Sequence, residues 1–159
     1  MDRLQRLLDI EALRALRAAY FHRLDHKLWD DWIGLFTEDA VLKVDLHEGW
    51  LSAGAPPFRI YEGAKVIVDF VSNRLRHART VHHGHTHEFT FLSDDEATGL
   101  WAMEDIVDYG DEGLVHGFGY YRDTYRRVGE DWKFSSVHLT RLRLDLTPPV
   151  SASGPPRVP

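Results

Sequence analysis

The sequence of 159 residues contains no cysteine, which excludes disulfide bonds, thiolate metal ligands and a cysteine nucleophile. It has no run of basic residues, and its formal charge is -6, so we expect no nucleic-acid partner. No apolar stretch reaches the roughly 18 residues of a membrane span, and the charged start Met1–Arg6 is unlike a signal peptide. We therefore expect a cytoplasmic protein with no membrane partner.

Apolar residues are plentiful instead: 43% of the chain is hydrophobic and 12% is aromatic, enough for one domain with a core. Leucines from Leu4 to Leu24 recur at steps of three and four, which predicts an amphipathic helix capped by Asp9 and ending near Asp25. We expect its polar face to carry Glu11, Arg14 and Arg17.

The remaining pattern predicts a short helix around Trp29–Phe36, a strand over Ala40–Leu46, a Gly/Pro-rich loop over Gly49–Pro57 and a helix over Gly63–Ala78. Alternation predicts four long strands: His82–Leu92, Ala97–Tyr109, Val115–Val128 and Trp132–Leu146. The fold class is therefore α+β: a cone-shaped barrel in which a curved antiparallel sheet wraps round the N-terminal helices. Residues 1–146 form one domain, and 147–159, with five of the seven prolines, form an extended or disordered tail.

Several stretches together resemble a known family. They are Tyr20–Asp25 with Trp29–Trp32 and Leu35–Ala40, Tyr61–Gly63, Thr80–His85, Ala97–Met103, and Tyr125–Arg127 with Trp132–Phe134 and Leu139–Leu142. Over roughly residues 5 to 146 the chain resembles SnoaL-like members of the nuclear transport factor 2-like superfamily. The resemblance is specific for the fold and much less so for the reaction.

The family includes scytalone dehydratase, bile-acid 7α-dehydratase and hexachlorocyclohexane dehydrochlorinase. The resemblance implies a catalytic histidine at His82 held by an aspartate at Asp25, a tyrosine at Tyr20 and a strand aspartate at Asp105. The polar residues by which scytalone dehydratase handles water fall on Gly119 and Tyr121 here, which puts that particular reaction in doubt.

The residue types fit this chemistry, because a neutral imidazole removes a proton and a carboxylate fixes its tautomer. The alternative is a capping aspartate and a strand-end histidine that never meet. Tyr20 is either a hydrogen-bond donor to a substrate oxygen or a core tyrosine. Asp105 is a general acid with a raised pKa if it points inward; a bulge would turn Glu104 inward instead.

Four histidines lie within six residues at the start of the first long strand. His83, His85 and His87 are expected on one strand face, opposite His82. Such a run suits either zinc or a polar outer rim. No cysteine assists and the resemblance is to metal-free enzymes, so we predict neither a metal nor a cofactor.

Apolar strand residues are expected to line a pocket for a hydrophobic small molecule: Trp101, Met103, Phe118, Tyr121, Val137 and Leu139. Arg141 either meets an anionic substrate group or pairs with a neighbour such as Asp145. Phe89, Phe91 and Leu92 are expected on the outer face of the sheet, which predicts a homodimer or homotrimer packed through it.

The sequence thus predicts a cofactor-independent lyase or isomerase of the dehydratase type, acting on a polycyclic, steroid, terpenoid or polyketide-like substrate. Two alternatives stay open because a fold does not fix a function. One is a non-catalytic small-molecule-binding or assembly domain, and the other is a structural protein like an oxygenase β subunit.

Overall fold

The computed structural model describes residues 2–46, 54 and 56–148. In chain order the elements are α1 (Arg3–Asp25), α2 (Trp29–Trp32), the 3₁₀ turn η1 (Ile33–Leu35), β1 (Phe36–Asp45), β2 (Phe58–Glu62), α3 (Ala64–Leu75), β3 (Arg79–Phe91), β4 (Glu96–Asp108), η3 (Gly110–Glu112), β5 (Leu114–Val128) and β6 (Asp131–Thr147). Most of the predicted Gly/Pro-rich loop and of the predicted tail lie outside the described residues.

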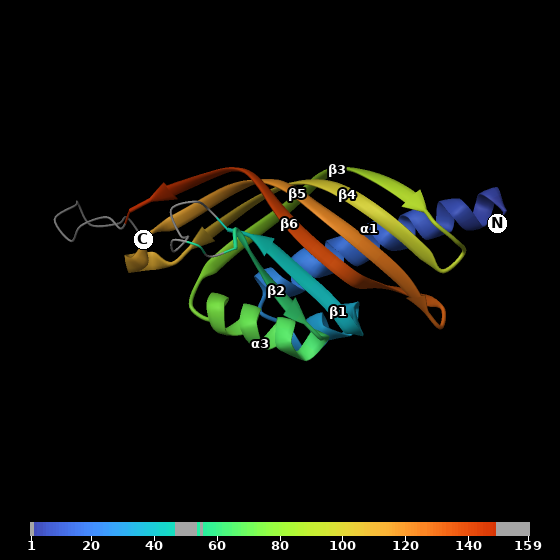
Figure 1. Ribbon diagram of the computed structural model, residues 1–159, viewed down its shortest axis with the longest axis horizontal. Helices are drawn as coiled ribbons and strands as arrows, with labels where there is room; N and C mark the ends of the chain where they lie inside the picture. The colour runs from blue at the N-terminus through green and yellow to red at the C-terminus, as the bar shows by residue number, and fades with distance from the viewer. Residues whose placement is uncertain (1, 47–53, 55, 149–159) are drawn as a thin grey trace.

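The six strands form one curved sheet in the order β2-β1-β6-β5-β4-β3. Figure 1 shows the long strands β3 to β6 arching over α1, while α3 lies beside β1 and β2. The predicted α+β cone is confirmed. The sheet is mixed rather than wholly antiparallel, because β1 lies parallel to β6. Strands far apart in the chain can pair in parallel once a long connection separates them.

The core lies between the concave face of the sheet and the helices. Leu13, Trp32, Ile67 and Phe134 have no exposed surface, and they come from α1, α2, α3 and β6. Each fully buried side chain of this size contributes about 1.5–3 kcal/mol of transfer free energy. The helices are therefore held against the sheet by apolar burial.

The predicted role of Asp9 as a helix cap is wrong, since α1 begins at Arg3 with Asp2 before it. Asp9 is 2% exposed and accepts hydrogen bonds from the Arg127 guanidinium (2.6 Å) and the Trp132 indole (3.1 Å). The first turns of α1 instead leave Leu4, Leu7 and Leu8 more than half exposed.

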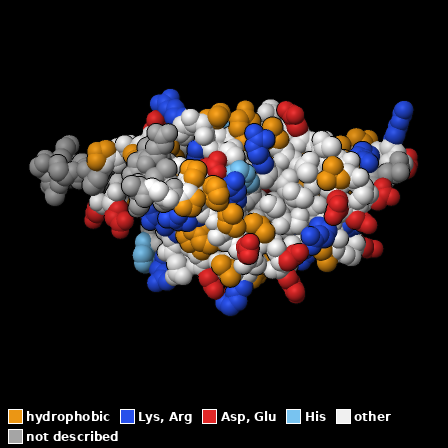
Figure 2. Space-filling model, viewed as in Figure 1, with side chains coloured by type: hydrophobic (Ala, Val, Ile, Leu, Met, Phe, Trp, Pro, Cys, Tyr) orange, Lys and Arg blue, Asp and Glu red, His pale blue; other side chains and the backbone are white. Residues whose placement is uncertain are grey.

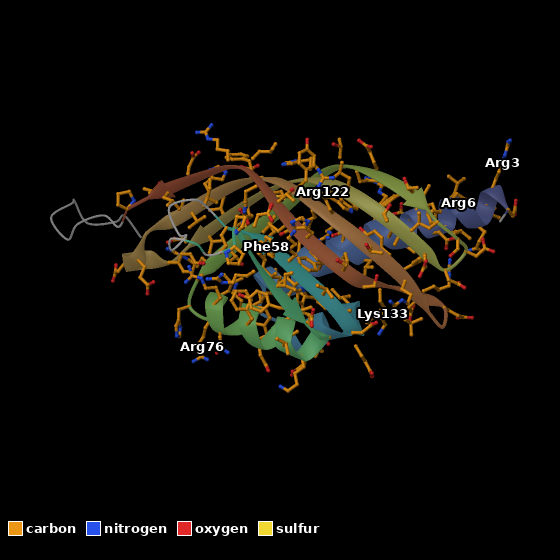
Figure 3. The ribbon with its side chains drawn as sticks, in the orientation of Figure 1. Arg3, Arg6, Phe58, Arg76, Arg122 and Lys133 are labelled. Carbon is orange, nitrogen blue, oxygen red and sulfur yellow. The ribbon has the colours of Figure 1, made fainter. Side chains whose placement is uncertain are left out.

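Phe89 and Phe91 pack against the core, so their predicted position on the outer face is wrong. Arg6, near the start of α1 in Figure 3, places its guanidinium 3.7 Å from the centre of the Phe91 ring. Leu92 alone of the three is well exposed. Assembly through the sheet stays a prediction, and it would need apolar residues other than Phe89 and Phe91. Within the described residues, no helix is both long and apolar enough to cross a membrane.

Candidate active site

His82 and Asp25 lie in direct contact where the end of α1 meets the first residues of β3. The His82 ring Nδ1 lies 2.6 Å from Asp25 Oδ1, and the His82 main-chain N–H donates to Oδ2 at 3.0 Å. Both side chains are largely buried, with 6% and 18% exposed. A carboxylate at Nδ1 places the hydrogen there and leaves Nε2 as the basic atom. The Phe21 ring is parallel to the imidazole, with centroids 6.2 Å apart.

Hydrogen-bond donors around Asp25 favour its ionised carboxylate form. Burial alone would raise the pKa of the Asp25 carboxyl, but hydrogen bonds from His82 and Thr80 and the charge of His82 outweigh burial. The pKa of Asp25 is therefore lowered below its ordinary value. An ionised Asp25 can hold the neutral imidazole in one tautomer and stabilise the imidazolium formed by proton transfer.

His82 forms part of the wall of a cavity of about 240 Å³ between the helices and the sheet. Its polar wall residues include Tyr20, Asp105 and Arg141. The apolar wall comes from α1, α3, four strands and the residue after β1. It comprises Leu24, Leu42, Val44, Leu46, Phe70, Val71, Leu75, Val107, Val115 and Leu139. Asp25 is not part of the wall, so a bound molecule would meet the imidazole while the carboxylate stays behind it.

A larger open hollow of about 740 Å³ lies outside the cavity, along α3. The two spaces share the walls Phe70, Arg74 and Tyr109. Figure 2 shows hydrophobic side chains gathered on this side of the molecule, around β2 and α3, with basic and acidic side chains among them. Because His82 borders the inner cavity and not the outer hollow, the inner cavity is the candidate active site.

Tyr20 and Tyr121 stand side by side in the cavity wall, with ring centroids 6.0 Å apart. Beneath them, the Arg17 guanidinium lies 4.5 Å and 4.3 Å from the two ring centres. Burial raises the pKa of the Tyr20 hydroxyl, and Arg17 opposes that rise. Tyr20 therefore stays a neutral hydrogen-bond donor at ordinary pH, held by packing against Tyr121.

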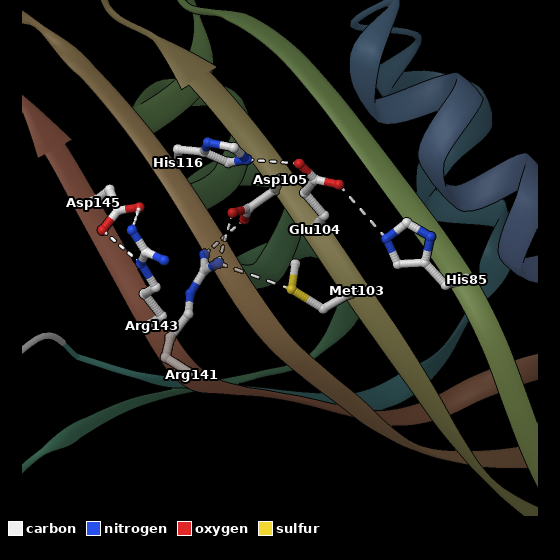
Figure 4. Close-up of polar contacts among 8 residues, drawn as sticks. All are labelled: His85, Met103, Glu104, Asp105, His116, Arg141, Arg143 and Asp145. Atoms are coloured by element: carbon white, nitrogen blue, oxygen red, sulfur yellow. Dashed lines mark hydrogen bonds and ion pairs between the residues drawn. The ribbon is translucent and has the colours of Figure 1, made fainter.

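Asp105 and Arg141 form a bidentate ion pair in the same wall. Arg141 Nη1 and Nη2 donate to the two Asp105 oxygens at 2.6 and 2.7 Å (Figure 4). Asp105 faces inward and is 2% exposed, whereas neighbouring Glu104 faces outward and contacts His116 at 2.6 Å. Both Asp105 oxygens are engaged, so neither is placed to protonate a leaving group as the sequence had suggested.

Comparison with known proteins identifies the family. The SnoaL-like domain profile matches residues 5–138, most of the chain. The chain belongs to the SnoaL-like family. This SnoaL-like protein is 25% identical to the probable cyclase FGR4 of Gibberella zeae over 79% of the chain and 86% of that protein.

Two solved structures share the fold. One is hexachlorocyclohexane dehydrochlorinase LinA-type3 from Novosphingobium barchaimii, with a TM-score of 0.74, 20% identity and 99% of each chain covered. The other is a protein of Novosphingobium aromaticivorans whose proposed identity is scytalone dehydratase, with a TM-score of 0.74, 19% identity and coverage of 94% and 98%. At these identities the structural likeness concerns the fold alone.

Four of the predicted pocket residues of this SnoaL-like protein lie elsewhere. Phe118 points to the outer face of the sheet, where its ring lies 4.5 Å from that of His116. The inward positions on either side of it are Gly117 and Gly119, which have no side chain. Trp101, Met103 and Val137 are buried in the core but do not border the cavity. Tyr121, Leu139 and Arg141 do border it.

A β-bulge changes the face of the histidine run. The register of β3 on β4 shifts between Gly84 and His87, so His87 turns inward. Its ring lies 4.7 Å from the Trp101 ring, whereas His83 and His85 remain outside. The predicted single face for His83, His85 and His87 is therefore wrong. In the part of the chain that the structure describes, no three His, Asp or Glu side chains are grouped to hold a metal.

The sequence reading missed the residues that support the site. Arg17, expected on the polar face of α1, is 1% exposed and forms an ion pair with Asp123 of β5. Its spacing of four from Leu13 and three from Tyr20 was the available signal, because it places Arg17 on the apolar stripe. Gly117 was also overlooked: a Cβ there would overlap Arg141 Nη1 and Asp105 Oδ1, so only glycine leaves room for that ion pair.

Proposed function

We propose that this protein is a cofactor-independent lyase or isomerase that removes a proton from carbon in a hydrophobic small molecule. The observation that carries the proposal is the placement of His82, whose ring borders an apolar cavity while Asp25 holds its Nδ1 from behind. A histidine fixed in this way is a general base with its free nitrogen on the substrate side.

The proposed step begins with a substrate carbonyl near Tyr20. His82 Nε2 takes a proton from the carbon next to that carbonyl, and the electron pair of the C–H bond moves to form an enolate. The Tyr20 hydroxyl donates a hydrogen bond to the enolate oxygen, and Asp25 stabilises the imidazolium. The enolate then expels a β-hydroxyl group, which receives the proton from His82 and leaves as water. Return of the proton to another carbon would instead give isomerisation.

Asp105 and Arg141 have a different part in this proposal. Their ion pair gives the cavity wall a charged patch, so we assign them to substrate orientation rather than proton transfer. The apolar part of the cavity wall favours a substrate with a compact ring system of the polycyclic, steroid, terpenoid or polyketide-like kind. The names of the relatives, a cyclase, a dehydrochlorinase and a dehydratase, support elimination or ring chemistry on small molecules.

The test is a search for loss of water from a panel of cyclic and polycyclic β-hydroxy ketones, followed by mass spectrometry. His82→Ala should abolish turnover, and Asp25→Asn should lower kcat by about 10²–10⁴-fold, the usual contribution of general acid–base catalysis. His83→Ala is the matched control, because His83 is the next residue on the strand but lies on the outer face. Equal turnover in His82→Ala and His83→Ala would contradict the proposal.

A non-catalytic binding domain remains the rival function, favoured by the apolar cavity itself. It predicts that panel compounds bind without being converted, and that His82→Ala changes affinity only modestly. The cytoplasmic location stays a prediction.

A further inference from the structure

Two side chains outside the cavity are linked to the His82–Asp25 pair by hydrogen bonds. The Thr80 hydroxyl donates to Asp25 Oδ1 at 2.8 Å. The Lys27 ammonium in turn donates to the Thr80 hydroxyl oxygen at 2.8 Å. Thr80 lies two residues before His82 on the same inward face of β3 and is 7% exposed. Asp25 therefore accepts hydrogen bonds from both Thr80 and His82, and Lys27 donates to Thr80.

The backbone conformation of Lys27 is unusual. Its φ of +60° is the one positive value of a non-glycine residue in the described ranges. The position directly follows the end of α1, where glycine is the ordinary residue because it has no Cβ. A lysine there keeps a disfavoured conformation, and strain of this kind points to a local role. A glycine at this position would have no amine to contact Thr80.

The contacts define what the two residues do. The Lys27 ammonium occupies a lone pair of the Thr80 oxygen, so the hydroxyl hydrogen is directed to Asp25. Asp25 then receives donors at both oxygens, which fixes the plane of its carboxylate against the His82 ring. The Thr80 hydroxyl and the His82 ring therefore meet at the same Asp25 oxygen, Oδ1.

We propose that Lys27 and Thr80 are positioning residues that hold Asp25 in one orientation, so that the His82 ring keeps its hydrogen on Nδ1. The catalytic meaning of this inference rests on the proposed function. The positioning itself can be measured on the free protein, without a substrate.

Other ionisable groups face His82 from the elements packed around it. Asp105 is its cross-strand partner on β4 and is bound to Arg141 of β6. Tyr20, Tyr109, Tyr121 and Arg74 border the same cavity. None of these groups is altered by substitutions at Lys27 or Thr80, so a change in the tautomer of His82 in those variants reports the Lys27–Thr80 contact.

The experiment is ¹⁵N and ¹³C NMR of the His82 ring over a series of pH values, which identifies the tautomer of the neutral imidazole. Lys27→Gly removes the amine and relieves the backbone strain, so the fold should hold or gain stability. We expect the Nε2–H tautomer of His82 to become detectable in Lys27→Gly and in Lys27→Met, because the Thr80 hydroxyl hydrogen is then no longer directed to Asp25. Lys27→Arg should restore the Nδ1–H form. Lys65→Met is the control, because Lys65 is an exposed lysine paired with Asp69.

Thr80→Val keeps the shape of the side chain and removes the hydroxyl. We expect the Nε2–H tautomer of His82 to become detectable in this variant, whereas the wild type shows only the Nδ1–H form. An unchanged tautomer in Lys27→Gly overturns the assignment of Lys27, and an unchanged tautomer in Thr80→Val overturns that of Thr80. These results do not depend on turnover, so this inference and the proposed function can fail separately.

Discussion

The buried ion pair between Arg17 and Asp123 should be one of the most sensitive points of the fold. The two side chains are 1% and 0% exposed, and Asp123 also accepts a hydrogen bond from the Tyr125 hydroxyl at 2.7 Å. Asp123→Asn would leave the Arg17 cation buried without its counter-charge. Breaking a buried pair in this way costs about 3–5 kcal/mol. For a domain of this size each kcal/mol lowers Tm by about 2–4 °C, so Tm should fall by about 6–20 °C.

The assay is thermal and urea unfolding of the single variant beside the double variant Arg17→Met/Asp123→Leu. Replacing both partners by apolar groups removes the unpaired charge, so the double variant should recover most of the lost stability. Asp39→Asn is the control, since the Asp39–Arg126 pair is largely exposed and should contribute less than about 1 kcal/mol. The reasoning is refuted if Asp123→Asn costs no more than Asp39→Asn, or if the double variant is less stable than the single one.

Three further predictions concern the site and the surface. Gly117→Ala should separate Arg141 from Asp105 and destabilise the protein by about 1–3 kcal/mol, as overpacking does. Gly34→Ala is the control, because a Cβ at Gly34 meets no other atom, and melting curves compare the two variants. The pKa of the Asp25 carboxyl is lowered in the folded protein, so Asp25 stabilises the fold at pH values above its ordinary pKa of about 3.9. This contribution is lost as the pH falls through the native pKa. Urea titrations from about pH 7 to 3 should therefore show a smaller fall in unfolding free energy at acid pH in Asp25→Asn than in the wild type. Leu142 is the extra residue of a bulge in β6 and is 76% exposed, so if the chain assembles through the sheet, Leu142→Glu should shift sedimentation toward the monomer.

Hydrophobic periodicity was sufficient to predict most of the fold. The four long strands and α3 were expected within a few residues of their observed ends, because their alternation or three-to-four spacing is regular. The short strand β2, Phe58–Glu62, was missed, because it follows a Gly/Pro-rich stretch and pairs only with β1. The start of β1 at Phe36 was also missed, since Trp29–Phe36 has the spacing of a helix.

The site was harder to predict from the sequence than the fold, because its geometry depends on tertiary contacts. The pairing of His82 with Asp25 was expected from family resemblance, and no local pattern relates positions 57 residues apart. The inward turn of His87 depends on a bulge that periodicity does not reveal. Arg17 was assigned to solvent because arginine is rarely buried, and only the position of Asp123 on β5 explains why it is.

The central claim, that His82 removes a proton from carbon, is tested most directly by hydrogen–deuterium exchange. Cyclic ketones that bind the protein would be incubated with it in D₂O, and exchange at the carbon next to the carbonyl would be followed by ¹H NMR. We predict exchange well above the buffer rate with the wild type and with His83→Ala, and exchange at the buffer rate with folded His82→Ala. Wild-type exchange rates in folded His82→Ala would contradict the claim.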